Sequence, residues 1–138
     1  MTRINKRSKW WLITWNWPFS DWRKHLVEGF LLVNDEIKCE DLWSVGNGVE
    51  RIIAAEEVAS NGMLHIHAVI EFKHVIFYSQ IRKHYNNVAN LKALKKDVFG
   101  YQTPIKYIFK SNPPRNKCLF HPALENWCEY TDILKQFF

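Results

Sequence analysis

Cysteine is scarce in this chain: the 138 residues contain three, Cys39, Cys118 and Cys128, and no two of them form a Cys-x-x-Cys pair. An odd number of scattered cysteines argues against the disulfide framework of a small secreted domain and favours a reducing compartment. Long apolar stretches are also missing: no run could span a bilayer, and no signal-peptide core follows the basic first residues. We therefore expect a soluble protein that has no membrane partner.

The chain also lacks internal repeats, low-complexity tracts and linkers rich in glycine and serine, so nothing divides it into parts. A length of 138 residues suits one domain, and a hydrophobic share of 47% is enough to argue against long disorder. The Gly-x-x-x-x-Gly-Lys-[Ser/Thr] phosphate loop of nucleotide hydrolases is absent as well. We expect a single domain over residues 1–138.

The net charge of +5 and a pI near 9.2 favour an anionic partner, although many basic proteins bind nothing acidic. The placement of the charge is more informative than its sum, because basic residues gather at the start of the chain and again in its second half. Seven tryptophans add a second signal, since such side chains either fill a core or stack on unpaired bases. The basic positions are Arg3, Lys6, Arg7 and Lys9, then Lys92, Lys95, Lys96, Lys106, Lys110, Arg115 and Lys117.

The apolar pattern mixes the periods of strands and helices without a regular βαβ rhythm, which predicts an α+β fold with a central antiparallel β-sheet flanked by helices. In the first strand, alternation puts Trp11, Ile13 and Trp15 on one face, which predicts a core face. Ser20 can cap a helix that carries Trp22, Leu26 and Phe30 on one side. The expected strands cover 9–16, 51–59, 64–72 and 88–94, with a turn at 60–62 and a polar connection at 34–41. Further helices are expected over 77–85 and 102–110 and within 123–138.

Two histidines, His65 and His67, are spaced so that both side chains leave the same face of a strand. Glu57, shortly before the hairpin turn, can bring a carboxylate to that face and complete a set of two imidazoles and one acid. The register decides this, because a two-residue turn at Asn61-Gly62 would put Glu56 in its place. By itself a His-x-His pair is more often two solvated side chains. The ligand set does not name the ion, but a hard cation such as Mg²⁺ or Mn²⁺ suits a site that also grips a phosphate oxygen.

Tyr107 and Lys110 lie three positions apart on the expected helix over 102–110, so they share one face. Phenols ionise with a pKa of about 10, so a tyrosine nucleophile needs help at neutral pH. The lysine ammonium can stabilise the phenolate or the charge that builds up on a phosphate. Alone, the pattern is also that of an ordinary amphipathic helix, and its meaning comes from its position after the His pair. Tyr101, the nearest competitor, has no basic residue three positions later.

In their order along the chain, Ile13-Thr14-Trp15-Asn16, His65-Ile66-His67 and Tyr107 to Lys110 resemble the three motifs of the replication initiator (Rep) proteins of circular single-stranded DNA viruses and rolling-circle plasmids, the HUH endonucleases. Each motif is weak alone, whereas the ordered trio is fairly specific. Trp17 departs from the pattern, because many members have a second asparagine there.

The resemblance implies an enzyme that nicks and joins single-stranded origin DNA. Its tyrosine attacks one phosphodiester, which leaves a free 3′-hydroxyl and a 5′-phosphotyrosine that a later hydroxyl can reverse. By the same resemblance, Glu57, His65 and His67 hold Mg²⁺ or Mn²⁺, and Tyr107 and Lys110 are catalytic. The expected DNA contacts are Thr14, Trp15, Asn16 and Arg115.

The resemblance also implies a longer protein, in which a helicase domain follows residues 1–138 and supports homo-oligomers. The expected location is the interior of a host cell, the nucleus for a eukaryotic virus and the cytoplasm otherwise. Two other interpretations stay open at this point. One is a single-domain HUH transposase with the same metal and tyrosine chemistry, and the other is a non-catalytic module that binds single-stranded DNA.

Overall fold

A computed structural model describes residues 6–16, 22–28, 30–33, 36–39, 44–85, 88–95, 102–110, 117–123 and 126–127. Within them the helices are α1 (Trp22–Glu28), α2 (Tyr78–His84) and α3 (Gln102–Ile108). The strands are β1 (Arg7–Asn16), β2 (Phe30–Val33), β3 (Glu36–Cys39), β4 (Ser44–Val45), β5 (Gly48–Val58), β6 (Leu64–Phe77), β7 (Val88–Ala93) and β8 (Cys118–His121).

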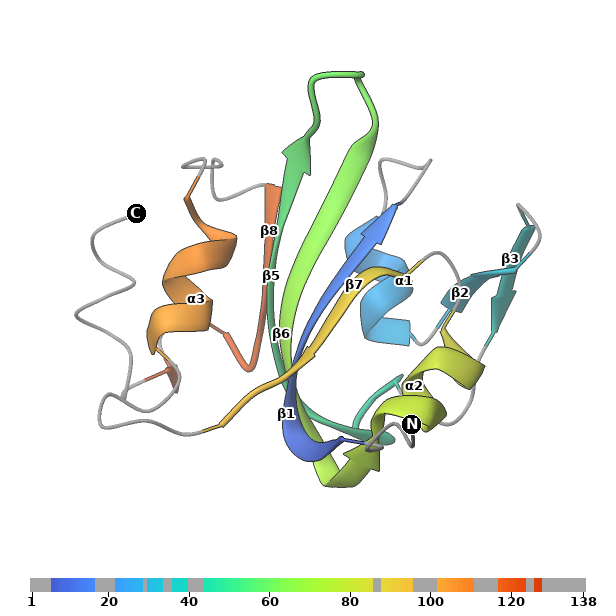
Figure 1. Ribbon diagram of the computed structural model, residues 1–138, viewed down its shortest axis with the longest axis vertical. Coiled ribbons are helices and arrows are strands. Elements are labelled where there is room, and N and C mark those ends of the chain that lie inside the picture. The colour runs from blue at the N-terminus through green and yellow to red at the C-terminus, as the bar shows by residue number, and fades with distance from the viewer. Residues whose placement is uncertain are drawn as a thin grey trace, which may run out of the picture.

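The centre of the molecule is a six-stranded sheet in the order β4-β5-β6-β1-β7, with β8 also paired to β5 (Figure 1). The long strands β5, β6 and β1 are antiparallel neighbours, as are β1 with β7 and β5 with β8. The short β4 runs parallel to β5, and β2 and β3 form a separate two-stranded ribbon. The predicted α+β class is confirmed, while the sheet is mixed rather than wholly antiparallel because of β4.

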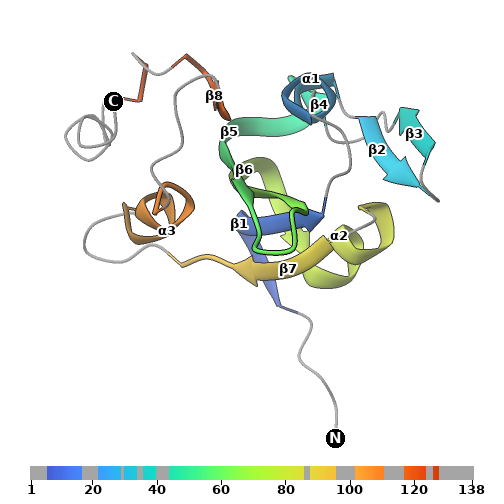
Figure 2. The ribbon, with the colours of Figure 1, turned by 90° about the horizontal axis from the view of Figure 1, so that it is seen from above.

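Both faces of the sheet are covered, α3 lying on one side and α1 and α2 on the other (Figure 1, Figure 2). Strand β1, which lies between β6 and β7, is therefore buried on both of its faces. Its residues Trp11, Ile13 and Trp15 join the core with α1 and α2, whereas Trp10 and Leu12 join the core with α3. The predicted alternation along this strand is confirmed, and the second face is a core face too.

The tryptophans that lie within the described residues are all buried, so they fill the two cores and present no open face to an unpaired base. They are Trp10, Trp11, Trp15, Trp22 and Trp127. The guanidinium carbon of Arg51 lies 5.0 Å from the ring centre of Trp10 and 5.1 Å from that of Trp127, which ties the indole at 127 to the sheet by cation–π contacts. Trp17 and Trp43 fall outside the described residues.

The first helix is shorter than its spacing pattern predicts. Helix α1 ends at Glu28, and Phe30 opens β2, so the prediction that Phe30 continues the helical stripe of Trp22 and Leu26 is wrong. A glycine follows Glu28 in the sequence, and glycine is a poor helix former. The predicted polar connection at 34–41 contains β3, which pairs with β2.

The other expected elements are close to those observed, and the expectations did not include the two-residue strand β4. Strand β6 runs on to Phe77, past its expected end at residue 72, and β8 was not expected. The predicted last helix within 123–138 falls almost wholly outside the described residues. Among the helices that are described, none is both long and apolar enough to cross a membrane.

Candidate active site

The hairpin between β5 and β6 decides which glutamate faces the histidines. Its loop has three residues, 60–62, closed by hydrogen bonds from Ala59 N–H to the Met63 carbonyl (2.9 Å) and from Gly62 N–H to the Ala59 carbonyl (2.8 Å). Gly62 has a φ of +83°, a left-handed conformation that favours glycine at this place in a three-residue loop. In the resulting register Glu57 lies directly opposite His65.

Glu56 consequently leaves the other face of β5, as expected. Its carboxylate accepts a hydrogen bond from the Trp22 indole N–H (2.8 Å) and lies 3.5 Å from the Lys117 ammonium. Glu56 therefore links strand β5 to α1 and to Lys117, the residue before β8. The alternative register, in which the two glutamates exchange places, is excluded.

The face that carries Glu57 also carries polar side chains from β6 and β1. Thr14 is paired with His67 and Asn16 with His65 across the β1–β6 ladder. The Thr14 hydroxyl oxygen lies 3.0 Å from His67 Nδ1, and both residues are buried. These residues form one polar patch at the hairpin end of this sheet face, beyond the apolar residues Ile53 and Val69.

Helix α3 packs on this same face and brings Tyr107 to the patch. Ile105, Ile108 and Phe109 are fully buried in the core beneath the helix, which fixes its rotation. The Tyr107 ring meets the His67 ring edge to face, with 5.8 Å between ring centres. Tyr107 remains 42% exposed, so it lies at the boundary between the patch and solvent.

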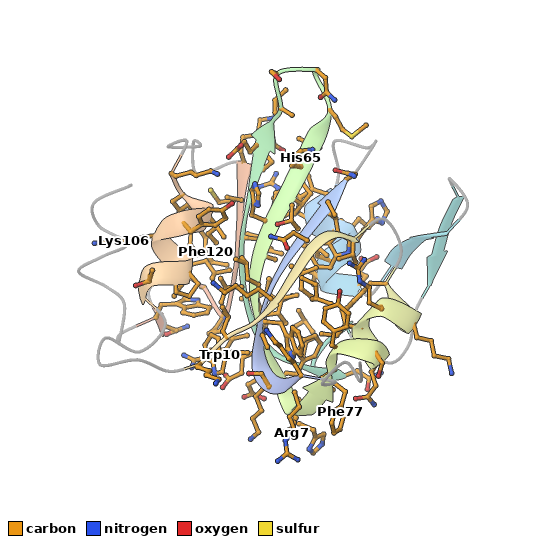
Figure 3. All side chains as sticks on the ribbon, in the orientation of Figure 1. Arg7, Trp10, His65, Phe77, Lys106 and Phe120 are labelled. Atoms are coloured by element: carbon orange, nitrogen blue, oxygen red, sulfur yellow. The ribbon has the colours of Figure 1, made fainter. Side chains whose placement is uncertain are left out.

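Lys110 completes the cluster. Its Nζ lies 4.3 Å from the centre of the Tyr107 ring, a cation–π contact made from one helical turn further along the chain. Lys106, on the same helix, is exposed and points away from the sheet, whereas His65 lies near the hairpin end of β6 (Figure 3). The two lysines thus have separate environments.

His67 is suited to act as a neutral ligand. Burial lowers its pKa below the usual value, Glu57 acts in the opposite sense, and Lys110 and His65 lower the pKa further. A lowered pKa keeps the imidazole neutral at physiological pH, and only a neutral imidazole can bind a metal ion.

The distance between two facing atoms tests whether a divalent cation fits at this site. His67 Nε2 and Glu57 Oε2 lie 3.7 Å apart, and each is a buried polar atom without a hydrogen-bond partner. Buried polar atoms are normally satisfied, so an orphaned pair of this kind calls for an explanation. Ligand atoms about 2.1 Å from a shared ion lie roughly 3 to 3.5 Å apart, which is close to the observed separation. A divalent cation fits between them.

His65, the third expected metal ligand, lies further from the other two ligands than they lie from each other. Its ring is 6.4 Å from that of His67, centre to centre and nearly perpendicular to it. Across the described ranges, no three His, Cys, Asp or Glu side chains are already placed as a complete metal site. The Glu57–His67 pair is therefore the preformed part, and a side-chain rotation would be needed to add His65.

The residues expected to contact DNA have different positions. Trp15 is 1% exposed and its ring packs edge on against Tyr85 in the core with α1 and α2, so it cannot stack on a base in this conformation. Thr14 is buried beside His67, a role that the motif did not suggest and that only the β1–β6 register reveals. Asn16 is partly buried at the patch, and Arg115 lies outside the described residues.

Cys118 is the rival nucleophile in this part of the fold. It lines a pocket of about 420 Å³ between α1 and β8, which Tyr107 and His67 do not line. Burial raises the pKa of the Cys118 thiol to about 12, with Arg23 lowering it and Glu56 raising it by smaller amounts. The thiol is therefore protonated at neutral pH and is a poor nucleophile.

Glu57→Gln is expected to weaken Mn²⁺ binding by about 100-fold or more, because it removes a charged ligand atom, and even partners of ligands are worth about 10-fold to 100-fold. The measurement is a titration of free Mn²⁺ by electron paramagnetic resonance. Glu56→Gln is the matched control, since it changes the neighbouring carboxylate on the opposite face. Equal Mn²⁺ affinity in the two variants would remove Glu57 from the ligand set.

Neither the models of known protein families nor the curated protein sequences include one that matches this chain. The order of the three motifs and the geometry of the site are what indicate a function, and the site residues that are brought together are Glu57, His67, Tyr107 and Lys110.

Proposed function

We propose that this chain is a metal-dependent endonuclease and strand transferase of single-stranded DNA, with an HUH-type nuclease fold, that initiates rolling-circle replication by nicking an origin. The observation that carries the proposal is the contact of Tyr107 with His67, whose Nε2 faces Glu57 across 3.7 Å. His67 and Tyr107, 40 positions apart in the chain, thereby meet on the sheet face that also carries Glu57. A tyrosine beside an imidazole and a carboxylate that can bind a metal ion suits phosphoryl transfer to a phenol.

In the proposed reaction, Tyr107 Oη forms a bond to the phosphorus of one phosphodiester, and the bond from phosphorus to the 3′-oxygen of the preceding nucleotide breaks. The phenol proton leaves and a proton is added to the departing oxygen, so the products are a 3′-hydroxyl and a 5′-phosphotyrosine. The tyrosyl ester retains the energy of the original linkage, and a second 3′-hydroxyl can reverse the attack. Joining therefore needs no nucleotide cofactor.

Glu57, His67 and His65 would hold Mg²⁺ or Mn²⁺. When bound, such an ion polarises a phosphate oxygen and stabilises the charge that develops there. Tyr107 supplies the nucleophile from the solvent-facing side of α3, where DNA can reach it. Lys110 holds a positive charge beside the Tyr107 ring, where it would stabilise the negative charge that develops on the phosphate during attack. The net charge of +5 attracts the phosphate backbone.

A single assay tests the proposal. The protein is incubated with a pool of single-stranded oligonucleotides that have a randomised centre and a 3′-terminal label, with Mn²⁺ or with EDTA. We expect a labelled protein adduct that survives denaturation, forms only with Mn²⁺, and maps by mass spectrometry to a nucleotide-bearing peptide that contains Tyr107. Binding of the pool without any adduct or cleavage would identify a non-catalytic DNA-binding module instead.

Lys110→Ala is expected to slow single-turnover nicking by about 100-fold with the fold retained, because removal of one positioned donor or charge costs roughly that factor. Lys106→Ala is the matched control, because Lys106 lies on α3, four residues before Lys110, and is directed away from the sheet. The two variants change the net charge equally, so a difference between them reports position rather than overall attraction to DNA. An unchanged single-turnover rate in Lys110→Ala would remove Lys110 from the mechanism.

A further inference from the structure

The hydrogen bond between Thr14 and His67 joins two buried residues that are 53 positions apart in the chain. Thr14 is 6% exposed and His67 is 5% exposed. Thr14 is flanked on β1 by Ile13 and Trp15, both fully buried in the opposite core, so its backbone has little freedom. The hydroxyl is therefore presented to His67 Nδ1 from a rigid strand.

The direction of this hydrogen bond decides what His67 can do. A neutral imidazole carries one proton, and a nitrogen that binds a cation must present a lone pair. If Nδ1–H donates to the Thr14 oxygen, Nε2 presents its lone pair to the space shared with Glu57. If the hydroxyl instead donates to Nδ1, the proton sits on Nε2 and blocks that space.

We propose that Thr14 is a positioning residue that accepts the Nδ1–H of His67 and so fixes its ring and its tautomer with Nε2 free to bind a cation beside Glu57. This inference extends the proposed function, and it rests on that function for the role of the bound cation. It departs from the DNA contact that the motif implies for Thr14, since a buried hydroxyl already bonded to an imidazole is not available to a DNA strand. Partners of this kind hold metal-binding histidines in place and raise their basicity.

The first test needs no substitution. The metal-free protein, labelled with ¹⁵N in histidine, is examined by long-range ¹H–¹⁵N correlation at a pH where His67 is neutral. We expect His67 to carry its proton on Nδ1. A proton on Nε2 would show that Thr14 donates to the ring, and it would overturn the inference.

The second test compares two substitutions of Thr14. Thr14→Val keeps the shape and removes the hydroxyl, whereas Thr14→Ser keeps the hydroxyl and removes a methyl group. We expect Thr14→Val to weaken Mn²⁺ affinity by about 10-fold to 100-fold and Thr14→Ser by less than about threefold, as is typical for the loss and the retention of a partner of a metal ligand. Equal affinities for Mn²⁺ in the two variants would overturn the inference.

A third measurement separates positioning from a DNA contact and from a purely structural role. In EDTA, Thr14→Val should bind single-stranded DNA as the unsubstituted protein does, and a weaker affinity would restore Thr14 as a DNA contact. A lowered melting temperature with unchanged Mn²⁺ affinity would reduce Thr14 to a structural residue and overturn the inference.

The tests distinguish failure of the inference from failure of the proposed function. If no oligonucleotide is cleaved, but the Nδ1 tautomer and the 10-fold loss in Thr14→Val are found, the positioning role stands and the nuclease proposal fails. If cleavage occurs and Thr14→Val binds Mn²⁺ normally, the nuclease proposal stands and the positioning role fails.

Discussion

His67→Ala is expected to abolish nicking while leaving most of the affinity for single-stranded DNA. His67 Nε2 is the ligand atom that already faces Glu57, and its loss leaves the buried Oε2 of that carboxylate without the atom opposite it. A bound cation is worth several kcal/mol of transition-state stabilisation, so the nicking rate should fall by about 10³-fold or more. The basic surface that attracts the DNA backbone is unchanged by this substitution.

The measurement is a single-turnover nicking rate in a buffer that fixes the free Mn²⁺ concentration, together with a DNA affinity measured in EDTA. His74→Ala is the matched control, because His74 is an exposed histidine on the same strand, β6, beyond the site. His65→Ala should also lose nicking, since the ligand set needs both imidazoles. Undiminished nicking by either site variant would contradict the assignment of the metal ligands.

Strand periodicity was sufficient to put His65 and His67 on one face, because side chains alternate along every strand whatever it pairs with. It was not sufficient to choose between Glu56 and Glu57, since a change of one residue in the turn exchanges the two faces. The choice depends on Gly62, whose left-handed φ of +83° allows the three-residue loop. The sequence offered both turns, and the backbone conformation selects one.

The order of the motifs predicts that Tyr107 lies close to His67, but the spacing of the residues along the chain does not determine this contact. It depends on how α3 rotates on the sheet, and that rotation follows from the burial of Ile105, Ile108 and Phe109 against β5 and β6. The hydrogen bond between Thr14 and His67 could not be predicted from the sequence for a similar reason. This hydrogen bond can be inferred only when the register of β1 and β6 is known, because Thr14 and His67 are 53 positions apart in the chain.

The short elements were missed because their patterns are weak or misleading. Phe30 follows Leu26 by four residues, a helical spacing, yet it belongs to β2. Strands β3 and β8 have four residues each, too few for either period to stand out from chance. These elements lie at the edges of the fold, so their omission did not affect the expected position of the histidines.

Tyr107→Phe is expected to eliminate the covalent adduct and to lower nicking by about 10³-fold or more, because the substitution removes the only atom that forms the new bond to phosphorus. The phenyl ring can keep its edge-to-face contact with His67 and its contact with Lys110, so the site should retain its shape. Mn²⁺ affinity and DNA affinity should therefore remain within about threefold of those of the unsubstituted protein, as expected for a loss confined to the chemical step.

Tyr78→Phe is the matched control for this substitution. Tyr78 is a partly buried tyrosine on α2, its hydroxyl accepts a hydrogen bond from Arg82 Nε (3.1 Å), and its ring packs near Trp11 in the core on the opposite side of the sheet. Both substitutions remove one phenolic hydroxyl, but Tyr78 lies on the other side of the sheet from the site. The adduct yield of Tyr78→Phe should therefore be unchanged. An adduct formed by Tyr107→Phe at the original rate would assign the nucleophile to another residue, and Tyr101, the nearest tyrosine in the sequence, would be the next to substitute.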